Sequence, residues 1–379
     1  MTNSDKIPKY PIGIQNFPKL REEGYLYIDK TALIHRLVST GGYYFLSRPR
    51  RFGKSLLLST IEAYFQGRRE LFTDLAIDSL TTEWDAHPVL HLALNGRQYA
   101  DTDSLIKELN RHLEIWEATY GDEKADRDVE ERFGYIIRRA YQRTGRKVVI
   151  LVDEYDTPLL HAYSNPGLAS NYRAILKAFY GNLKTCDQYI KFAMLTGVAR
   201  FSKVSIFSDL NNLNDISFED AYSAICGITD TELREQFRPG LQQLADSLNL
   251  DLDGVLHQLR YRYDGYRFSA RGTDIYNPFS LMNVFRSHRL TDYWFETGTP
   301  TFVVNMLRRG QWRLPDLEGY RIRPTTLAMA GVEGDDPIPV LYQSGYLTIK
   351  SYDSQFNKYI LGYPNSEVRQ SFLEFLLPY

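Results

Sequence analysis

A loop that could hold phosphate groups lies at residues 47–55, which read SRPRRFGKS. In a phosphate-binding loop of the Walker A type, backbone N–H groups at a helix start hold the phosphates, a lysine adds positive charge, and a hydroxyl reaches Mg²⁺. Gly53, Lys54 and Ser55 match the last three positions of that pattern. The pattern asks for a glycine where this chain has Arg48. Because that glycine mainly eases the entry turn, Arg48 alters the geometry of the loop without removing a ligand.

The residues around Gly53 are expected to surround the nucleotide, because an apolar run enters the loop and a helical run leaves it. Together with one acid further along the chain, they form the predicted nucleotide-binding set. This set is Arg50, Arg51, Phe52, Gly53, Lys54, Ser55, Leu56 and Asp153.

An apolar run ending in two acids lies about a hundred residues further on, as KVVILVDE at residues 147–154. This is the Walker B pattern, in which Asp153 would hold Mg²⁺ together with Ser55, and Glu154 would polarise the attacking water. The alternative is a buried strand whose acids cap the following turn. The presence of the first motif favours the catalytic interpretation.

A third apolar run, at residues 190–195, ends in the polar sequence TGVAR. Thr196 could hydrogen-bond the γ-phosphate or the attacking water, which makes it the candidate sensor of the nucleotide. Arg200 could stabilise charge in the transition state, either in its own chain or in a neighbouring copy. A plain surface salt bridge is an equally good interpretation of Arg200.

Alternating strand-like and helical runs in the first half must position these motifs. Buried strands are predicted at residues 43–46, 89–94, 148–152 and 190–195. Apolar residues between them recur at helical spacing, and such long crossovers favour a parallel sheet. The sequence therefore predicts an α/β fold, a P-loop NTPase of the ASCE or AAA-like type with a parallel central sheet.

The second half is mostly helical. Asn277-Pro278 and Thr299-Pro300 have the cap-then-proline pattern of helix starts, residues 346–363 read as a β-hairpin, and residues 330–339 resemble a linker. We expect an ATPase domain at residues 1–209, a helical lid at 210–329, and a C-terminal hairpin and helix, winged-helix-like, at 330–379.

The overall composition excludes several classes of protein. The net charge of −2 gives no global attraction to nucleic acid, and no stretch approaches the ~18 apolar residues of a membrane span. The polar start MTNSDKIPKY is unlike a signal peptide, so a cytoplasmic protein without a membrane partner is expected. Cys186 and Cys226 are too few for a disulfide framework and are expected to be buried thiols.

Several segments together resemble the AAA-ATPase-like family, bacterial P-loop ATPases of the STAND and archaeal-ATPase type. The resembling segments lie at residues 11–31, 47–57, 150–159, 195–213, 263–269, 276–283 and 344–350. The resemblance implies that the loop often lacks its first glycine, so Arg48 is compatible with a working ATP site that uses Mg²⁺. It also implies that residues 27–31 flank the adenine and that a helical lid follows residue 210.

The resemblance further implies a nuclease-like domain of the PD-(D/E)XK type after the ATPase in full-length relatives. Its metal-binding set, an Asp and a Glu-x-Lys, does not follow Tyr363 in this sequence, so we expect that domain to be absent here. The apolar run at residues 371–379 is expected to pack on the body or on something that followed it.

Three weaker signals bear on nucleic acid and metal. Residues 259–271, LRYRYDGYRFSAR, interleave arginines with aromatic residues, as nucleic-acid-binding segments do, although packed tyrosines of a lid are favoured. Residues 340–342 could start a recognition helix beside the hairpin, but they lack basic residues, and a structural role is at least as good an interpretation. Pro88 between His87 and His91 argues against a metal site there.

The sequence therefore favours an ATP-hydrolysing switch that regulates an activity directed at nucleic acid, through another domain, a partner protein or a homo-oligomer. Two alternatives stay open. One is an interaction scaffold that binds ATP with negligible turnover, and the other is a DNA-binding protein whose nucleotide site only regulates its affinity. Retention of Glu154 after Asp153 favours hydrolysis.

Overall fold

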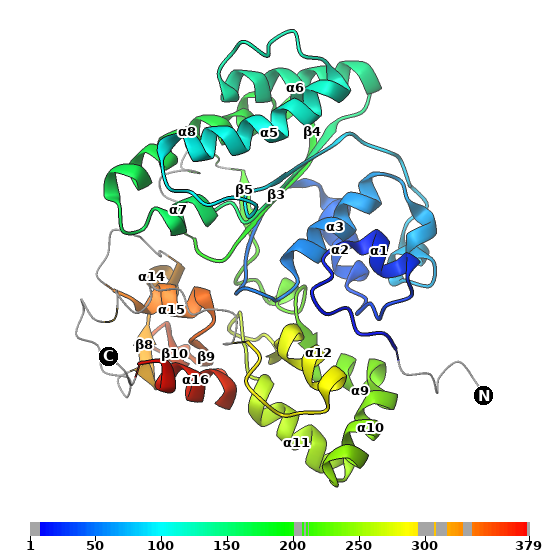
Figure 1. The fold of residues 1–379 in the computed structure, drawn as a ribbon, viewed down its shortest axis with the longest axis vertical. Helices are drawn as coiled ribbons and strands as arrows, with labels where there is room; N and C mark the ends of the chain where they lie inside the picture. Colours follow the sequence, from blue (N-terminus) through cyan, green and yellow to red (C-terminus); the bar gives the residue numbers. More distant parts are fainter. Residues whose placement is uncertain are drawn as a thin grey trace.

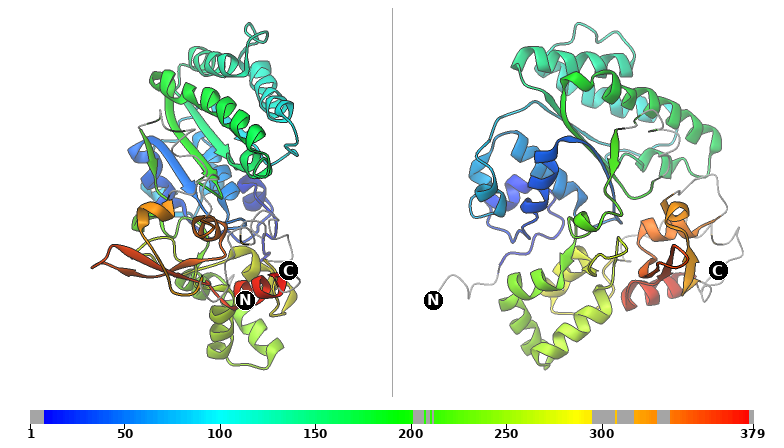
Figure 2. Two further views of the ribbon diagram at one scale, coloured as in Figure 1. Left: turned by 90° about the vertical axis from the view of Figure 1, so that its left-hand side faces the viewer. Right: turned by 180° about the vertical axis from the view of Figure 1, so that it is seen from behind.

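The computed structural model describes residues 8–200, 212–294, 317–328 and 336–376, with the single residues 207, 210 and 307. Three groups of elements can be followed in Figure 1: a sheet flanked by helices, a helical lobe below it, and a small C-terminal module beside that lobe. Figure 2 shows the same groups from the side and from behind. Among the described helices, none combines the length and the apolar character needed to cross a membrane.

A five-stranded parallel sheet forms the centre of the first group. Its strands are β1 Gly42–Ser47, β2 Val89–Ala93, β3 Val148–Asp153, β4 Ile190–Gly197 and β5 Leu213–Asp215. Their spatial order is β2-β3-β4-β1-β5, and every neighbouring pair is parallel. The predicted α/β fold of the P-loop NTPase type is confirmed, and all four predicted strands are present.

Helices cover both faces of this sheet. They are α1 Phe17–Glu22, α2 Thr31–Thr40, α3 Lys54–Phe65, α4 Ala76–Leu80, α5 Thr102–Tyr120, α6 Val129–Thr144, α7 Thr157–His161 and α8 Pro166–Thr185. The helices α2 and α3 lie on one face, and α5, α6 and α8 lie on the other (Figure 1). Successive residues of β3 point to opposite faces: Val149 and Leu151 pack toward α3, while Ile150 and Val152 pack toward α5, α6 and α8. A strand buried on both faces explains the continuous apolar run.

The helical lobe follows the sheet. It comprises β6 Ile228–Thr229, α9 Asp230–Gln236, α10 Arg238–Leu248, α11 Leu252–Tyr263, β7 Ile275–Tyr276 and α12 Pro278–Ser287. Asn277 caps α12 as predicted, because its side chain accepts the N–H groups of Phe279 and Ser280. The lobe has its own core, on which Tyr10 of the N-terminal segment stacks. The predicted helix start at Thr299-Pro300 lies outside the described residues.

The C-terminal module contains a three-stranded antiparallel sheet and three helices. Its elements are β8 Tyr320–Ile322, α14 Pro324–Ala328, α15 Ile338–Ser344, β9 Thr348–Asp353, β10 Lys358–Gly362 and α16 Ser366–Leu376. The predicted hairpin is confirmed as β9 and β10, and it projects from the body in the side view of Figure 2. The helix α16 docks on the body through Val368 and Phe372.

Two boundaries differ from the sequence prediction. The sheet continues past residue 209, because β5 ends at Asp215. The linker-like stretch at 330–339 is shorter than predicted, because α15 already begins at Ile338 and places Pro339 in its first turn, where a missing N–H costs nothing. The division into an ATPase domain, a lid and a C-terminal segment stays a prediction.

Candidate functional site

The loop that the sequence predicts to bind phosphate, called the phosphate-binding loop below, leaves β1 at Ser47 and enters α3 at Lys54. Gly53 has a φ of +92°, a left-handed conformation that glycine adopts without strain, and it forms the cap of α3. The Lys54 side chain is buried and reaches back across the loop, where its ammonium group donates hydrogen bonds to the carbonyls of Arg48 (3.0 Å) and Pro49 (3.1 Å). A positive charge and free helix N–H groups therefore face the same small space.

Three predicted site residues meet at the carboxyl ends of neighbouring strands. The Ser55 hydroxyl donates to Asp153 Oδ2 at 2.5 Å, and the Thr196 hydroxyl donates to Asp153 Oδ1 at 2.7 Å. The strand order explains this meeting, because β4 lies between β1 and β3 and all three point the same way. The structure thus brings together a hydroxyl, a carboxylate and the candidate sensor beside Lys54.

This donor set fits Mg²⁺ in the way that nucleotide sites hold it. Mg²⁺ prefers oxygen ligands and is usually bound by one or two protein oxygens together with water and substrate phosphates. The Ser55 hydroxyl and the Asp153 carboxylate supply two such oxygens. Across the described residues, no group of three or more His, Cys, Asp or Glu side chains could hold a metal ion without such help.

Glu154 follows directly after Asp153, at the turn that leaves β3. Its backbone has a φ of +53°, which is uncommon for residues with a side chain and typical of strained functional turns. The half-buried carboxylate accepts a hydrogen bond of 3.2 Å from the Thr157 hydroxyl. An acidic group is therefore held beside the Ser55, Asp153 and Thr196 cluster, as a general base would need to be.

Arg48, at the position of the missing glycine, points away from the phosphate side of the loop. Its guanidinium is buried and donates to the carbonyls of Ser47 (2.9 Å), Ser217 (2.9 Å) and Tyr222 (3.1 Å), and it lies 4.2 Å from the centre of the Phe268 ring. Burial lowers the pKa of Arg48 below its ordinary value. Arg48 therefore anchors the loop to the chain that follows β5.

Arg200 is also buried, but it does not join the cluster at Asp153. Its guanidinium forms an ion pair with Asp215 of β5 and lies 5.0 Å from the centre of the Phe218 ring. Burial, the largest cause, lowers the pKa of Arg200 to about 10. Its backbone N–H donates to Gln343 of α15 at 2.8 Å. A salt bridge is therefore present at Arg200, but it is buried and does not lie at the surface as predicted, because Arg200 and Asp215 are both enclosed by the fold.

The other predicted loop residues divide into two groups. Arg51 stacks on the Phe279 ring at 3.7 Å, and Phe52 packs edge-on against Tyr266 and Phe268, so both fasten the loop to the segment after α11. The carbonyl of Arg50 accepts a hydrogen bond of 3.4 Å from the indole of Trp294. Leu56 belongs to the second group, because it faces a pocket beside the helix start.

That pocket has a volume of about 90 Å³ and is mostly apolar. Its walls come from the N-terminal segment, the phosphate-binding loop and the helical lobe. They include Leu26, Tyr27, Ile28, Phe52, Gly53, Leu56, Cys226, Gly227 and Met282. Lys30 stands at the pocket and is paired with Glu232 of α9 at 2.5 Å. An apolar pocket that adjoins a phosphate-binding loop suits the flat ring of a nucleobase.

Sequence reasoning did not single out Asp156, the third acid of the run after β3. Its side chain is completely buried and accepts backbone N–H groups of Val198 (3.0 Å) and Ala199 (2.6 Å). Burial raises the pKa of this carboxyl to about 6, although the nearby Lys54 opposes the shift. The acid was visible in the sequence DEYD, but its partners are backbone groups, which leave no pattern in a sequence.

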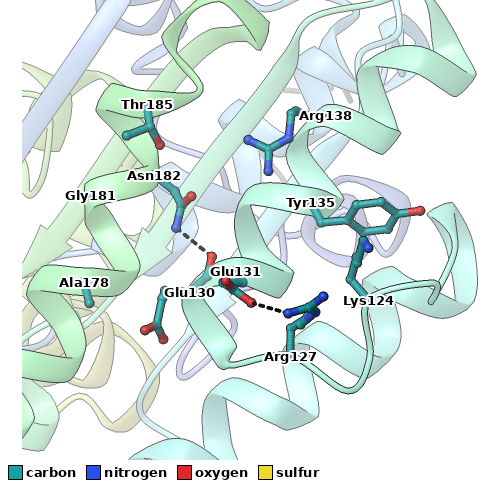
Figure 3. Close-up of a pocket in the computed structure, with 10 residues that line it drawn as sticks. All are labelled: Lys124, Arg127, Glu130, Glu131, Tyr135, Arg138, Ala178, Gly181, Asn182 and Thr185. Atoms are coloured by element: carbon teal, nitrogen blue, oxygen red, sulfur yellow. Dashed lines mark hydrogen bonds and ion pairs between the residues drawn. The ribbon is translucent and has the colours of Figure 1, made fainter.

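A second hollow lies between α6 and α8, away from the predicted site residues (Figure 3). Its lining carries charges of both signs, and several of these groups already have partners: Arg127 pairs with Glu131, and Asn182 donates to the carbonyl of Glu130. Its lining residues form no cluster like that of Ser55, Asp153 and Thr196, so we do not consider it a candidate site.

The weaker signals have structural explanations. Tyr263, Tyr266 and Phe268 are buried, so three of the four aromatic residues in the arginine-rich stretch are unavailable for stacking on bases. The helix α15 is buried along its whole length, which leaves no face for a DNA groove. His91 pairs with Glu62 at 2.8 Å, while His87 contacts the carbonyl of Lys147. Both cysteines are buried free thiols, as predicted.

Comparison with known proteins identifies the family to which the chain belongs. The family described as "AAA-ATPase_like: Predicted AAA-ATPase" matches residues 11–207. A protein from Azotobacter chroococcum mcd 1, described as "Uncharacterized protein in vnfD 5'region", is 41% identical over 375 residues, which cover 97% of this chain and 70% of that protein. The chain therefore belongs to the AAA-ATPase-like family of predicted AAA-ATPases, for which nucleotide binding and hydrolysis are expected.

Proposed function

We propose that this chain binds ATP with Mg²⁺ and hydrolyses it as a conformational switch. The observation that carries the proposal is the hydrogen-bonded cluster of Ser55, Asp153 and Thr196, with Lys54 inside the adjoining loop. The same edge of the sheet thus presents a charge for phosphates, oxygens for Mg²⁺ and a candidate base. These are the parts that phosphoryl transfer requires.

Each residue would have one role. Lys54 and the N–H groups at the start of α3 would bind the phosphates, and Ser55 and Asp153 would hold Mg²⁺, which neutralises phosphate charge when bound. Glu154 would accept a proton from the attacking water, and Thr196 would hydrogen-bond the γ-phosphate. Arg200 could stabilise transition-state charge only after leaving Asp215, so that role requires a rearrangement.

The nucleobase would occupy the apolar pocket beside Leu56. Leu26, Tyr27 and Ile28 line this pocket, which supports the expectation that the segment before α2 flanks the adenine. Arg50, Arg51 and Phe52 would act mainly by holding the loop, since Arg51 and Phe52 are packed against aromatic rings and Arg50 contacts Trp294 through its carbonyl.

The loop also contacts both other parts of the molecule, which supports a switch. The Phe52 carbonyl accepts the N–H of Gly227 at 3.2 Å, at the start of the helical lobe. Gly345, between α15 and β9, is so close to the loop that a Cβ there would lie 2.9 Å from Pro49 Cβ. A change in the loop on ATP binding or hydrolysis would therefore move the lobe, the module or both.

The output of the switch is proposed to be an activity directed at nucleic acid, supplied by another domain, a partner or a homo-oligomer. This step rests on the resemblance of the chain to its family. The interaction scaffold remains an alternative. The burial of Tyr263, Tyr266 and Phe268 argues against direct DNA binding through that stretch.

The test is Mg²⁺-dependent ATP turnover and binding by the wild type, Lys54→Ala and Glu154→Gln, with and without DNA. Loss of Lys54 should weaken ATP binding by about 10- to 100-fold, because it removes charged hydrogen bonds. Loss of the base should lower kcat by about 100-fold or more while ATP still binds. The exposed α5 residues Lys107 and Glu114 provide matched controls, as Lys107→Ala and Glu114→Gln.

Three outcomes would change the proposal. Equal turnover by wild type and Glu154→Gln, with ATP bound, would establish the scaffold. Absence of ATP binding by the wild type would show that the assignment of the nucleotide site is wrong. A steep salt dependence of DNA binding that ATP modulates without turnover would favour the DNA-binding alternative.

A further inference from the structure

Asp156 is an acid inside the site region to which the proposed chemistry gives no task. It follows Glu154 by two residues, has no exposed surface, and lies near Lys54 and Glu154. Its Oδ2 atom accepts two hydrogen bonds, whereas its Oδ1 atom has no hydrogen-bond partner among the described residues. Burying a carboxylate is costly, so a fold that keeps one must gain something from it.

The two hydrogen bonds join the turn after β3 to the end of β4. Asp156 accepts the N–H groups of Val198 and Ala199, the second and third residues after Thr196. Tyr155 makes two more connections, because its N–H donates to the Thr196 carbonyl (3.0 Å) and its hydroxyl donates to the Ala199 carbonyl (2.8 Å). Tyr155 and Asp156, which directly follow Glu154, are thus both hydrogen-bonded to the end of the strand that carries Thr196.

Gly197 permits this close contact. A Cβ at Gly197 would lie 2.6 Å from Asp156 Oδ1 and 2.7 Å from the Tyr155 ring, both well inside van der Waals contact. The ring of Tyr155 is buried and cannot move aside cheaply. The turn and the strand end are therefore in direct contact, and a side chain at residue 197 would force them apart.

We propose that Asp156 is a positioning residue that sets Glu154 and Thr196 at the correct separation for ATP hydrolysis, acting through the N–H groups of Val198 and Ala199. This inference rests on the proposed function. Asp156 itself would not transfer a proton or touch the nucleotide. Small displacements of catalytic groups are costly, since a shift of about 1 Å can lower a rate about 100-fold.

The test compares Asp156→Ala, Asp156→Asn and Gly197→Ala with the wild type. Asparagine keeps an oxygen that can accept both N–H groups, so Asp156→Asn should retain nearly the wild-type kcat. Alanine removes the acceptor, and a methyl group at Gly197 pushes the contact apart, so each should lower kcat about 10- to 100-fold. In all three, affinity for the non-hydrolysable analogue AMP-PNP with Mg²⁺ should stay unchanged.

Asp264→Asn is the matched control, because Asp264 is another buried aspartate with a raised pKa, located at the end of α11. It should leave kcat unchanged. Hydrogen exchange at the amides of Val198 and Ala199 should accelerate in Asp156→Ala and not in Asp156→Asn.

The outcomes separate this inference from the proposed function. Equal loss of kcat in Asp156→Asn and Asp156→Ala would assign the carboxylate a direct chemical role and overturn positioning. Unchanged kcat in Asp156→Ala, or a parallel loss of AMP-PNP binding, would also overturn it. A wild type that binds AMP-PNP but does not turn over ATP would reject the proposed function, and positioning for hydrolysis would fall with it.

Discussion

Arg48 occupies the position where a Walker A loop usually begins with glycine, and its side chain has a structural role that glycine could not fill. The guanidinium leaves the phosphate side of the loop and binds the carbonyls of Ser217 and Tyr222. The carbonyls that accept from its two Nη atoms and the facing Phe268 ring offset part of the cost of burying this cation. Arg48, which departs from the Walker A pattern, therefore holds the loop from the side opposite the predicted phosphate site.

Arg48→Gly restores the Walker A consensus and is nevertheless expected to damage the protein. It leaves three buried carbonyls without their donor and creates a cavity, so the free energy of unfolding should fall by about 2–4 kcal/mol. ATP affinity should fall as well, because the loop loses its anchor. Denaturant unfolding and equilibrium ATP binding measure the two effects, with Arg48→Lys expected to be intermediate. An Arg48→Gly protein as stable as the wild type would show that the anchor is dispensable.

The grouping of Ser55, Asp153 and Thr196 could be anticipated from the sequence, because the carboxyl ends of neighbouring parallel strands meet at one edge. The position of Arg200 could not be anticipated from the sequence. Its partner, Asp215, lies on a three-residue edge strand that is too short to give a periodic pattern. Arg48 and Asp156 escaped for a different reason, since their partners are backbone groups. The catalytic roles themselves stay predictions until turnover is measured.

At the scale of elements, long buried strands and capped helices were predictable, and short elements were not. Six residues of β3 are all apolar or acidic, and α12 begins with a recognisable cap and proline. The paired strands β6 and β7 have two residues each, and Ile228 and Tyr276 within them belong to the core of the lobe. Their tertiary context outweighs any local preference.

A buried acid, Glu367, makes polar contacts between the helix α16 and the rest of the protein, in addition to the packing of Val368 and Phe372. The carboxylate accepts hydrogen bonds from the hydroxyl of Ser280 in α12 and from the N–H groups of Tyr293 and Trp294. Burial, the largest cause, raises the pKa of Glu367 to about 7, and these hydrogen bonds oppose the shift. The nearby Asp292 raises it further. Near neutral pH, this contact therefore changes its protonation state.

Glu367→Gln should consequently alter the pH dependence of stability. Since the folded pKa lies above the ordinary value, the folded state binds more protons, and wild-type stability falls as pH rises from about 4.5 to about 7. Above pH 7, ionisation of the buried carboxyl lowers the free energy of unfolding of the wild type by about 3 kcal/mol. The variant does not lose this stability, because its amide does not ionise and keeps an acceptor oxygen. In thermal unfolding, the Tm of the variant relative to that of the wild type should be higher at pH 8 than at pH 5.

Glu374→Gln, on the exposed side of the same helix, is the control and should follow the wild type at both pH values. If Glu367→Gln also follows the wild type, the carboxyl titrates equally in the folded and unfolded states, and the buried-acid explanation fails.

At the scale of the whole molecule, the phosphate-binding loop lies where three parts converge. The core on the α3 face of the sheet continues without interruption into the C-terminal module, so that Phe52, Tyr346 and Phe372 belong to one cluster. Trp294 lies between the loop and the module, because its indole donates to Arg50 and its ring packs on Tyr346 at 5.4 Å. Trp294 is therefore placed to report events at the loop.

Binding of AMP-PNP with Mg²⁺ should change the intrinsic tryptophan fluorescence of the wild type. The change should disappear in Trp294→Phe and persist in Trp116→Phe, because Trp116 lies in the separate core on the other face of the sheet. Stopped-flow or steady-state fluorescence measures this. A change that survives in Trp294→Phe while AMP-PNP still binds would show that the loop and the module are not coupled through this residue.

The hydrogen bond from Trp294 to Arg50 joins residues 244 positions apart, which has a consequence for the making of the protein. A ribosome synthesises Arg50 first, and Trp294 emerges only after a further 244 residues. Contacts between such distant residues form late, because the chain must first lose the entropy of closing a long loop. The predicted phosphate-binding loop is therefore expected to lack this contact until Trp294 has emerged from the ribosome.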